Sequence, residues 1–307
     1  MKKVLAEYGA YLEENGKSHH TIKAYTNDIQ AFFFDTRIKF GGYVVAGDIR
    51  RWIKEMLTPK EGRALAVSTI NRRLNSLRGF FVWALEKGYV QADPMRDIHD
   101  IRVADEEQEK IMWLTEEEFE ELLERMRTMP IKSRGVDPEE KYRRDRAIVY
   151  ILTYTGIRVE ELSNLKINDL DMQFRKIRVV GKGRKVRTIP IATLLYHDLM
   201  DWLDFRSEVA KKKHHVAESL YVFYSQRSNQ LSVRGIQTML EAYSTPQKKL
   251  TPHMFRHTFC KWMIKSTNND IEKVRRLAGH SHISTTARYI KDSYTDLANA
   301  VESLPRI

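Results

Sequence analysis

Apolar residues recur at helical spacing through most of this chain, which limits the folds that it can adopt. Ile22, Tyr25 and Ile29 repeat every three or four positions after Ser18, a residue type that commonly caps a helix. Within the first hundred residues, such a pattern occupies residues 4–12, a segment that begins at Ser18, residues 48–56 and a segment that begins at Ser68. The N-terminal third of the chain is therefore predicted to be helical.

One stretch in the second half alternates as paired β-strands do. Residues 176–180 and 185–189 each alternate, and the glycine-rich residues 181–184 between them are typical of a hairpin turn. Residues 127–142 hold two prolines, a glycine and several charges, and predict a surface loop, whereas residues 146–154 predict a buried helix. Together these patterns indicate a mainly α fold with a small β-sheet.

The length of 307 residues is enough for two domains of ordinary size. Residues 101–112 include a tight acidic cluster without apolar periodicity, which predicts an exposed linker. Thr115 and Glu118 then have the spacing of a capping box, which begins the next helix. We therefore predict a helical domain over residues 1–100 and a second domain over residues 113–307.

Charge and composition narrow the class of protein. The chain is 42% hydrophobic and 30% charged, as folded domains are, and its net charge of +11 favours a polyanionic partner such as nucleic acid. Cys260 is the single cysteine, which excludes a disulfide framework and a thiolate metal site. No apolar run approaches the roughly 20 residues of a membrane span, and no signal-peptide core follows Met1. We expect no membrane contact and a cytoplasmic location.

The polar face of the segment that begins at Ser68 is rich in arginine and asparagine. It carries Asn71, Arg72, Arg73, Asn75 and Arg78. Such a face is often only solvated surface. It also suits a helix that lies along a DNA duplex and contacts phosphates and base edges. Both interpretations are compatible with the sequence.

Candidate catalytic residues gather between positions 251 and 289. His253 and Arg256 are three residues apart, so a helix would put both on one face, and Tyr289 follows His280 by nine residues. Each histidine alone could be a satisfied core residue, which is the commoner fate of a single histidine. Further upstream, Arg158 follows a glycine at the predicted start of a helix, where it could hold an anion or pair with a nearby glutamate.

Lys182 lies at the tip of the predicted hairpin. A lysine there can contact a DNA backbone or can simply be solvated, and Lys176 and Lys185 are rivals nearby. Taken in chain order, these residues resemble the set of the tyrosine recombinase (phage integrase) family, especially its compact Xer-like members: Arg158, Lys182, His253, Arg256, His280 and Tyr289. Residues 70–78 are similar to that family's core-binding domain, and residues 279–286 to its tyrosine-bearing motif.

The resemblance implies an N-terminal core-binding domain that binds DNA and a C-terminal α+β catalytic domain. It also implies a division of roles. Arg158 and Arg256 would clamp the scissile phosphate with help from His280. Tyr289 would attack phosphorus, although an ordinary tyrosine is only about 0.1% ionised at pH 7. The proton transfers would fall to His253, the best candidate base, and to Lys182, the donor to the departing 5′ oxygen.

The product would be a 3′-phosphotyrosyl link, which conserves the bond energy, so that religation needs no ATP, metal or other cofactor. Substrates would be double-stranded DNA sites with paired inverted half-sites, bound by two protomers each and joined in a homotetrameric synapse. Apolar residues from Tyr294 to Leu304 recur on one helix face and would dock on a neighbouring protomer. The chain begins almost directly at the core-binding domain, which favours the Xer-like branch.

The biological role could be Xer-like resolution or the integration and excision of a mobile element. A type IB-like topoisomerase, which nicks and reseals without strand exchange, would use a similar residue set. A DNA-binding protein that has lost catalysis is a third hypothesis, against which the intact set argues.

Overall fold

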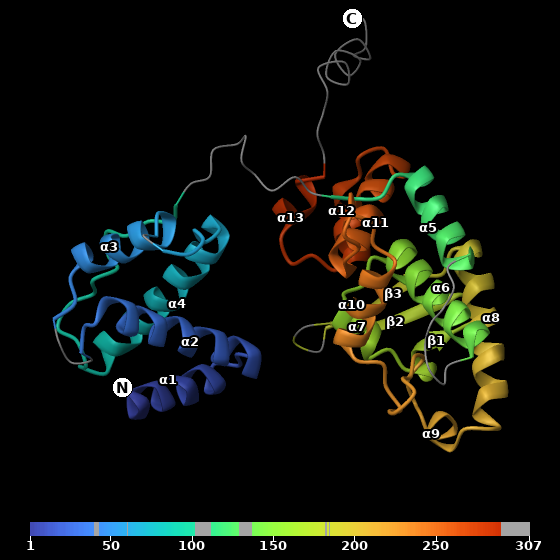
Figure 1. Ribbon diagram of the computed structural model, residues 1–307, viewed down its shortest axis with the longest axis horizontal. Helices are drawn as coiled ribbons and strands as arrows, with labels where there is room; N and C mark the ends of the chain where they lie inside the picture. The colour runs from blue at the N-terminus through green and yellow to red at the C-terminus, as the bar shows by residue number, and fades with distance from the viewer. Residues whose placement is uncertain are drawn as a thin grey trace, which may run out of the picture. The chain divides into compact units, whose positions relative to one another are not determined.

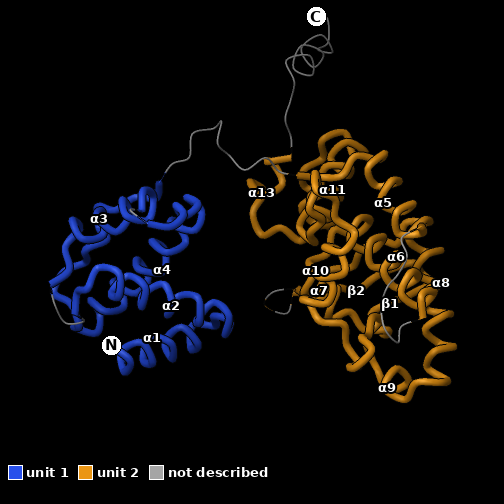
Figure 2. The backbone as a smooth tube through the Cα atoms, in the orientation of Figure 1, with its two compact units in different colours: residues 1–109 blue, residues 110–307 orange. Residues whose placement is uncertain are grey.

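The computed structural model describes residues 1–39, 43–59, 61–101, 112–128, 137–181, 183 and 185–289. The chain divides into two compact units, residues 1–109 and residues 110–307 (Figure 2). The interior of the predicted linker, residues 102–111, lies outside the described residues, so the limits of that linker stay a prediction. None of the described helices is long and apolar enough to cross a membrane.

Unit 1 contains four helices within its described residues, as the apolar pattern predicts. They are α1 (Lys2–Glu14), α2 (His19–Thr36), α3 (Ala46–Leu57) and α4 (Val67–Glu86). Helix α2 packs against the other three. Aromatic side chains fill the core, where the Phe32 and Trp52 rings meet edge to face with centroids 5.2 Å apart. The Ser18 side chain caps α2 by accepting from the Thr21 amide at 3.2 Å.

Unit 2 combines helices with one small sheet (Figure 1). In chain order its elements are α5 (Glu116–Thr128), α6 (Pro138–Thr155), α7 (Val159–Ser163), the 3-10 helix η2 (Ile167–Asp169), β1 (Leu170–Asp171), β2 (Lys176–Val180), β3 (Val186–Pro190), α8 (Thr193–Ala210), α9 (His214–Ala217), α10 (Val233–Ala242), α11 (Pro252–Ser266), α12 (Ile271–Ala278) and α13 (Ile283–Ala287). The strands are antiparallel in the order β1-β2-β3, and Ile177 pairs with Ile189. A mainly α fold with a small sheet is thus confirmed.

The predicted loop over residues 127–142 is wrong at its end. Helix α6 already begins at Pro138, because Asp137 accepts from the Glu139 amide as N-cap and proline suits the first helical turn. Glu139 and Glu140 add negative charge where the helix dipole favours it. The charges that suggested a loop are therefore helix-start signals. Residues 129–136 of that loop lie outside the described residues.

Helix α6 is the centre of unit 2. Residues 147–152 are all buried, and the helix packs against α5, α8 and α11 (Figure 1). An apolar run on every face of a helix is what burial on all sides requires. At the start of α5, the predicted capping box is present, with Thr115 and Glu118 exchanging hydrogen bonds at 2.9 and 3.2 Å. The helices that carry the candidate site thus rest on a rigid core.

Candidate active site

The site is built around the sharp turn between α6 and α7. Gly156 ends α6 in the left-handed conformation, with φ of +58°, and a Cβ there would lie 2.2 Å from Cδ1 of Phe259 on α11. Only glycine allows this approach of α11. The turn leaves Arg158 as the N-cap residue of α7, and the Arg256 guanidinium donates to the Gly156 carbonyl. The two arginines are therefore brought together by one backbone turn.

Glu161 holds Arg158 in place. Its carboxylate accepts from the Arg158 amide at 2.8 Å and from the Arg158 guanidinium at 3.2 Å. Burial disfavours the charged carboxylate, yet hydrogen bonds from Arg187 and from the Arg158 amide outweigh it and hold the pKa of Glu161 below its usual value. The Arg158 side chain remains 38% exposed. The pairing with a glutamate considered from the sequence and an anion-binding role are therefore compatible.

Arg256 carries a buried donor that lacks an acceptor. Its side chain is 6% exposed, and its Nη2 has no hydrogen-bond partner among the described residues. Burial and then the nearby Arg158 charge lower the pKa of Arg256 to about 10. An unpaired buried donor costs about 1 to 3 kcal/mol. An incoming anion would accept from the orphaned nitrogen and would neutralise the two neighbouring guanidinium charges.

His280 completes this cationic cluster from the turn after α12. Gly279 ends α12 with φ of +70°, and its carbonyl accepts from Nη2 of Arg158 at 3.0 Å. The His280 ring is buried, and its Nδ1 lies 2.9 Å from Oγ1 of Thr286. Burial, followed by the charges of Arg256 and Arg158, lowers the pKa of His280 to about 4. The ring is thus neutral at pH 7, and a Thr286 hydroxyl that donates to Nδ1 would leave the proton on Nε2.

Tyr289 lies just past α13 and is buried against α11. Its ring is 5% exposed, in a cluster with Phe259, Cys260 and Ile264. The hydroxyl forms a hydrogen bond with Nδ1 of His257, and the Tyr289 carbonyl accepts from Lys261 at 3.1 Å. Burial raises the pKa of the Tyr289 phenol above its usual value, with a further contribution from Cys260. The phenol is therefore protonated at neutral pH in this conformation.

Sequence reasoning missed His257. It follows His253 by four residues, which places both on one face of α11, and the ring centroids are 6.4 Å apart. That spacing was the available signal. His253 itself is exposed, and its assignment as the base stays a prediction. Burial lowers the pKa of His257 to about 4, with help from His253 and Arg288, so a neutral His257 ring meets the phenol.

Lys182 lies outside the described residues, so its role stays a prediction. The hairpin that carries it is present as β2 and β3. Its two rivals are exposed, and the Lys176 ammonium lies 5.5 Å from the Phe174 ring centroid. The same part of the chain holds a further residue that the sequence did not suggest, Arg187, which donates to both oxygens of Glu161 at 2.9 and 2.8 Å.

The predicted DNA-contacting face of α4 has internal partners in unit 1. Arg72 and Arg73 both pair with the buried Asp28. Arg78 bonds with Asn75, with Asp100 at 3.1 Å and with the Ile98 carbonyl at 3.2 Å, while the Asn71 amide makes two bonds of 2.9 Å to the Ile101 backbone. The Arg72 side chain is still 47% exposed. Contacts to DNA from this helix stay a prediction.

The site consists of hydrogen-bond donors and imidazole rings. Among the described residues, no three His, Cys, Asp or Glu side chains gather as a metal ion would require. What the arrangement offers an incoming phosphate is two guanidinium groups, a neutral imidazole and a phenol, all supplied by α7, α11 and the segment after α12.

Comparison with known proteins covers both units. Residues 112–296 match the phage integrase family, and residues 5–88 match the phage integrase N-terminal SAM-like domain. The tyrosine recombinase XerC of Thermodesulfovibrio yellowstonii is 28% identical and covers 94% of this chain and 90% of its own length. The XerC of Roseiflexus castenholzii is 32% identical, with 90% of this chain and 84% of that protein covered.

The fold is similar to that of a solved transposon enzyme. The Tn1549 transposon integrase in complex with transposon right end DNA matches with a TM-score of 0.72 at 20% identity, and 98% of this chain and 99% of that chain are covered. At such low identity the likeness concerns the fold.

Proposed function

Because the chain belongs to the phage integrase family and is a tyrosine-type site-specific recombinase, we propose that Tyr289 cleaves double-stranded DNA and that strands are exchanged between two sites. The observation that carries the assignment of the site is that Arg158 and Arg256 lie close together, with an unsatisfied buried donor on Arg256. Such a cationic cluster beside a tyrosine suits attack on a phosphodiester.

The scissile phosphate would bind between the two guanidinium groups. Arg256 would use its orphaned Nη2, Arg158 its exposed edge, and His280 the proton on Nε2. Charge builds up on the non-bridging oxygens as phosphorus becomes pentacovalent, and fixed donors stabilise it without reorganisation. The neutral His280 ring keeps one N–H, and it can donate that hydrogen bond to the phosphate without transferring the proton.

Tyr289 would be the nucleophile. In the conformation described here it is buried and bonded to His257, so cleavage requires the phenol to reach the phosphate and to lose its proton to a histidine. His253 is exposed on the same helix face as His257, within one turn, and would accept that proton. Lys182 would protonate the departing 5′ oxygen. The resulting 3′-phosphotyrosyl bond would be resolved by the 5′ hydroxyl of another strand, which exchanges strands without ATP.

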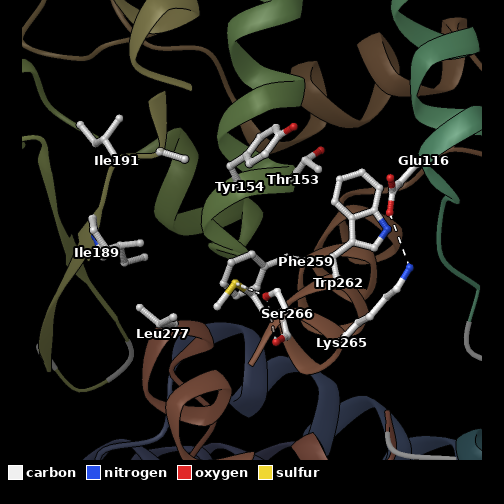
Figure 3. A pocket seen from close by; sticks show the side chains of 13 residues that line it. Glu116, Thr153, Tyr154, Ile189, Ile191, Phe259, Trp262, Lys265, Ser266 and Leu277 are labelled. Atoms are coloured by element: carbon white, nitrogen blue, oxygen red, sulfur yellow. Dashed lines mark hydrogen bonds and ion pairs between the residues drawn. The ribbon is translucent and has the colours of Figure 1, made fainter. Parts of the chain in front are cut away.

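We further propose that four protomers act together on paired inverted half-sites. An apolar pocket of about 620 Å³ opens beside the site, with Phe259, Trp262 and Leu277 among its lining residues (Figure 3). The chain after Tyr289 carries an apolar stripe of its own in sequence, formed by Tyr294, Leu297, Ala298, Val301 and Leu304. Insertion of that stripe into the pocket of the next protomer would build a closed ring by head-to-tail contacts. We also propose a cytoplasmic location, where the enzyme would meet its DNA substrate.

A strand-exchange assay tests this function. The core site would be selected from random duplexes by the wild-type protein, and the DNA that flanks the gene would be tried beside it. Two copies on one plasmid should recombine with wild-type protein and with Tyr294→Phe. Tyr289→Phe should bind the site and yield no recombinant. Nicking and relaxation without exchange, or activity of Tyr289→Phe, would contradict the proposal.

A further inference from the structure

Arg187 is a half-buried arginine on β3 that touches the site without belonging to the predicted set. Its side chain is 15% exposed. Nη1 and Nη2 donate to the two oxygens of Glu161 at 2.9 and 2.8 Å, and Nε donates to the Leu277 carbonyl at 3.1 Å. A planar fork that grips both carboxylate oxygens fixes orientation as well as charge. Arg187 therefore fastens β3 to α7 on one side and to α12 on the other.

The first contact reaches Arg158. Glu161 accepts from Arg187 through a fork and from the Arg158 guanidinium through one longer bond of 3.2 Å. Arg187 is thus the main neutralising partner of the buried carboxylate, and its hydrogen bond is the leading influence that lowers the pKa of Glu161 against burial. Without that partner, Glu161 would form a closer ion pair with the Arg158 guanidinium. The positive charge of Arg158 would then be partly neutralised by Glu161 and would attract an incoming phosphate less strongly.

The second contact reaches the turn that delivers His280. A Cβ on Gly279 would lie 3.0 Å from Cζ and Nη1 of Arg187 and 3.1 Å from Nε, so the guanidinium lies directly against this residue. The Gly279 carbonyl in turn accepts from Arg158 at 3.0 Å. One guanidinium is therefore in contact with the supports of both Arg158 and His280.

We propose that Arg187 is a positioning residue for DNA cleavage: it occupies Glu161, so that the Arg158 charge stays available to the scissile phosphate, and it fixes the turn that carries His280. The inference rests on the proposed function. Arg187 has no role in DNA affinity under this scheme, because each of its three guanidinium nitrogens donates to a protein acceptor. Its loss should therefore slow cleavage and leave binding unchanged.

The test compares Arg187→Gln and Arg187→Lys with Arg178→Gln. Arg178 lies on β2 of the same hairpin, but its side chain is 57% exposed and its partner is Asp169, at 3.0 Å. Each protein is given a nicked suicide duplex whose scissile group is either a phosphate or an uncharged methylphosphonate. Site affinity is measured by gel shift, and the covalent adduct is followed in a single turnover.

On the phosphate substrate, we expect Arg187→Gln to form adduct about 100-fold more slowly and Arg187→Lys about tenfold more slowly, with affinity within about threefold of wild type. On the methylphosphonate, Arg158 and Arg256 have less negative charge to stabilise, so the decrease in adduct rate relative to wild type should shrink to about threefold or less. Arg178→Gln should behave as wild type on both. If Arg187→Gln does not fold, as judged by a missing cooperative unfolding transition, Arg187→Lys carries the comparison.

Wild-type rates in the Arg187 variants would overturn the inference, as would an equal fractional loss on both substrates, which indicates mere structural damage. These outcomes leave the proposed function intact, because wild type and Arg178→Gln still form the adduct. Absence of adduct from wild type and Arg178→Gln alike would instead refute the proposed function, and the inference would fall with it.

Discussion

Charge is distributed unevenly among the residues of the site. Glu161 receives hydrogen bonds from both Arg187 and Arg158, whereas the Nη2 of Arg256 has no partner in the described part of the chain. Burying a charge without a partner is costly, so such a nitrogen is retained where a ligand supplies the missing acceptor. In the unfolded chain water would solvate the Arg256 guanidinium, so burial of this side chain lowers the stability of the fold.

His280 should make the stability of the fold depend on pH. Its pKa is lowered from 6.5 to about 4 by burial and by the charges of Arg256, Arg158 and Arg187, with His257 also facing it. Between these values the unfolded chain binds a proton that the folded chain excludes, so the free energy of unfolding falls as the pH drops from 6.5 to 4. The loss should reach up to about 3 kcal/mol.

Urea unfolding at several pH values measures this effect. The control is His280→Asn, whose amide can still bond with Thr286 but does not titrate. It should show a shallower decline over the same interval, because His257 and the carboxylates contribute equally to both proteins. Parallel curves for wild type and His280→Asn would contradict the expectation.

At the scale of elements, the turn from α6 into α7 holds both arginines of the site. Gly156→Ala should lower the free energy of unfolding by at least about 2 kcal/mol, because a Cβ would meet the Phe259 ring at 2.2 Å and φ is +58°. Gly183→Ala provides the match: φ there is +72°, but nothing lies within 4 Å of the added carbon. It should cost about 1 kcal/mol, the strain of the backbone alone.

Both variants would be unfolded in urea and followed by tryptophan fluorescence. An equal loss for the two glycines would mean that the approach of α11 to the turn contributes nothing. Because Arg256 bonds to the Gly156 carbonyl, the Gly156→Ala protein should also bind DNA and form adduct poorly, beyond what its stability explains.

The elements follow from the sequence to different degrees. Periodicity predicted the four helices of unit 1 and the hairpin, because burial of one face imposes a period on the residues. Helix ends were harder to predict, because capping and local charge decide them: α3 begins at Ala46 rather than residue 48, and α6 begins at Pro138. Among site residues, Arg187 and Glu161 are 26 positions apart. No local pattern reveals such a pair, because the fold alone joins them.

At the scale of the whole molecule, the assembly proposal predicts a separable defect. Met263 lines the apolar pocket, and Met263→Glu places a charge where the Tyr294–Leu304 stripe of a neighbour would insert. This variant should occupy a single half-site normally but fail to form the four-protomer complex with two sites. Leu194→Glu, at a 56% exposed apolar residue outside the pocket, should assemble as wild type. Multi-angle light scattering on the DNA complexes gives the masses, and normal assembly by Met263→Glu would contradict the proposed docking.

The central claim is that one phenol becomes linked to DNA. The most direct measurement is to trap the protein on a nicked duplex that carries its selected site, denature and digest it, and identify the nucleotide-bearing peptide by mass spectrometry. We predict a single modified residue, Tyr289, joined to a 3′ phosphate and absent from Tyr289→Phe. A nucleotide attached to Tyr294 or to any other residue, or persistent adduct in Tyr289→Phe, would contradict the account.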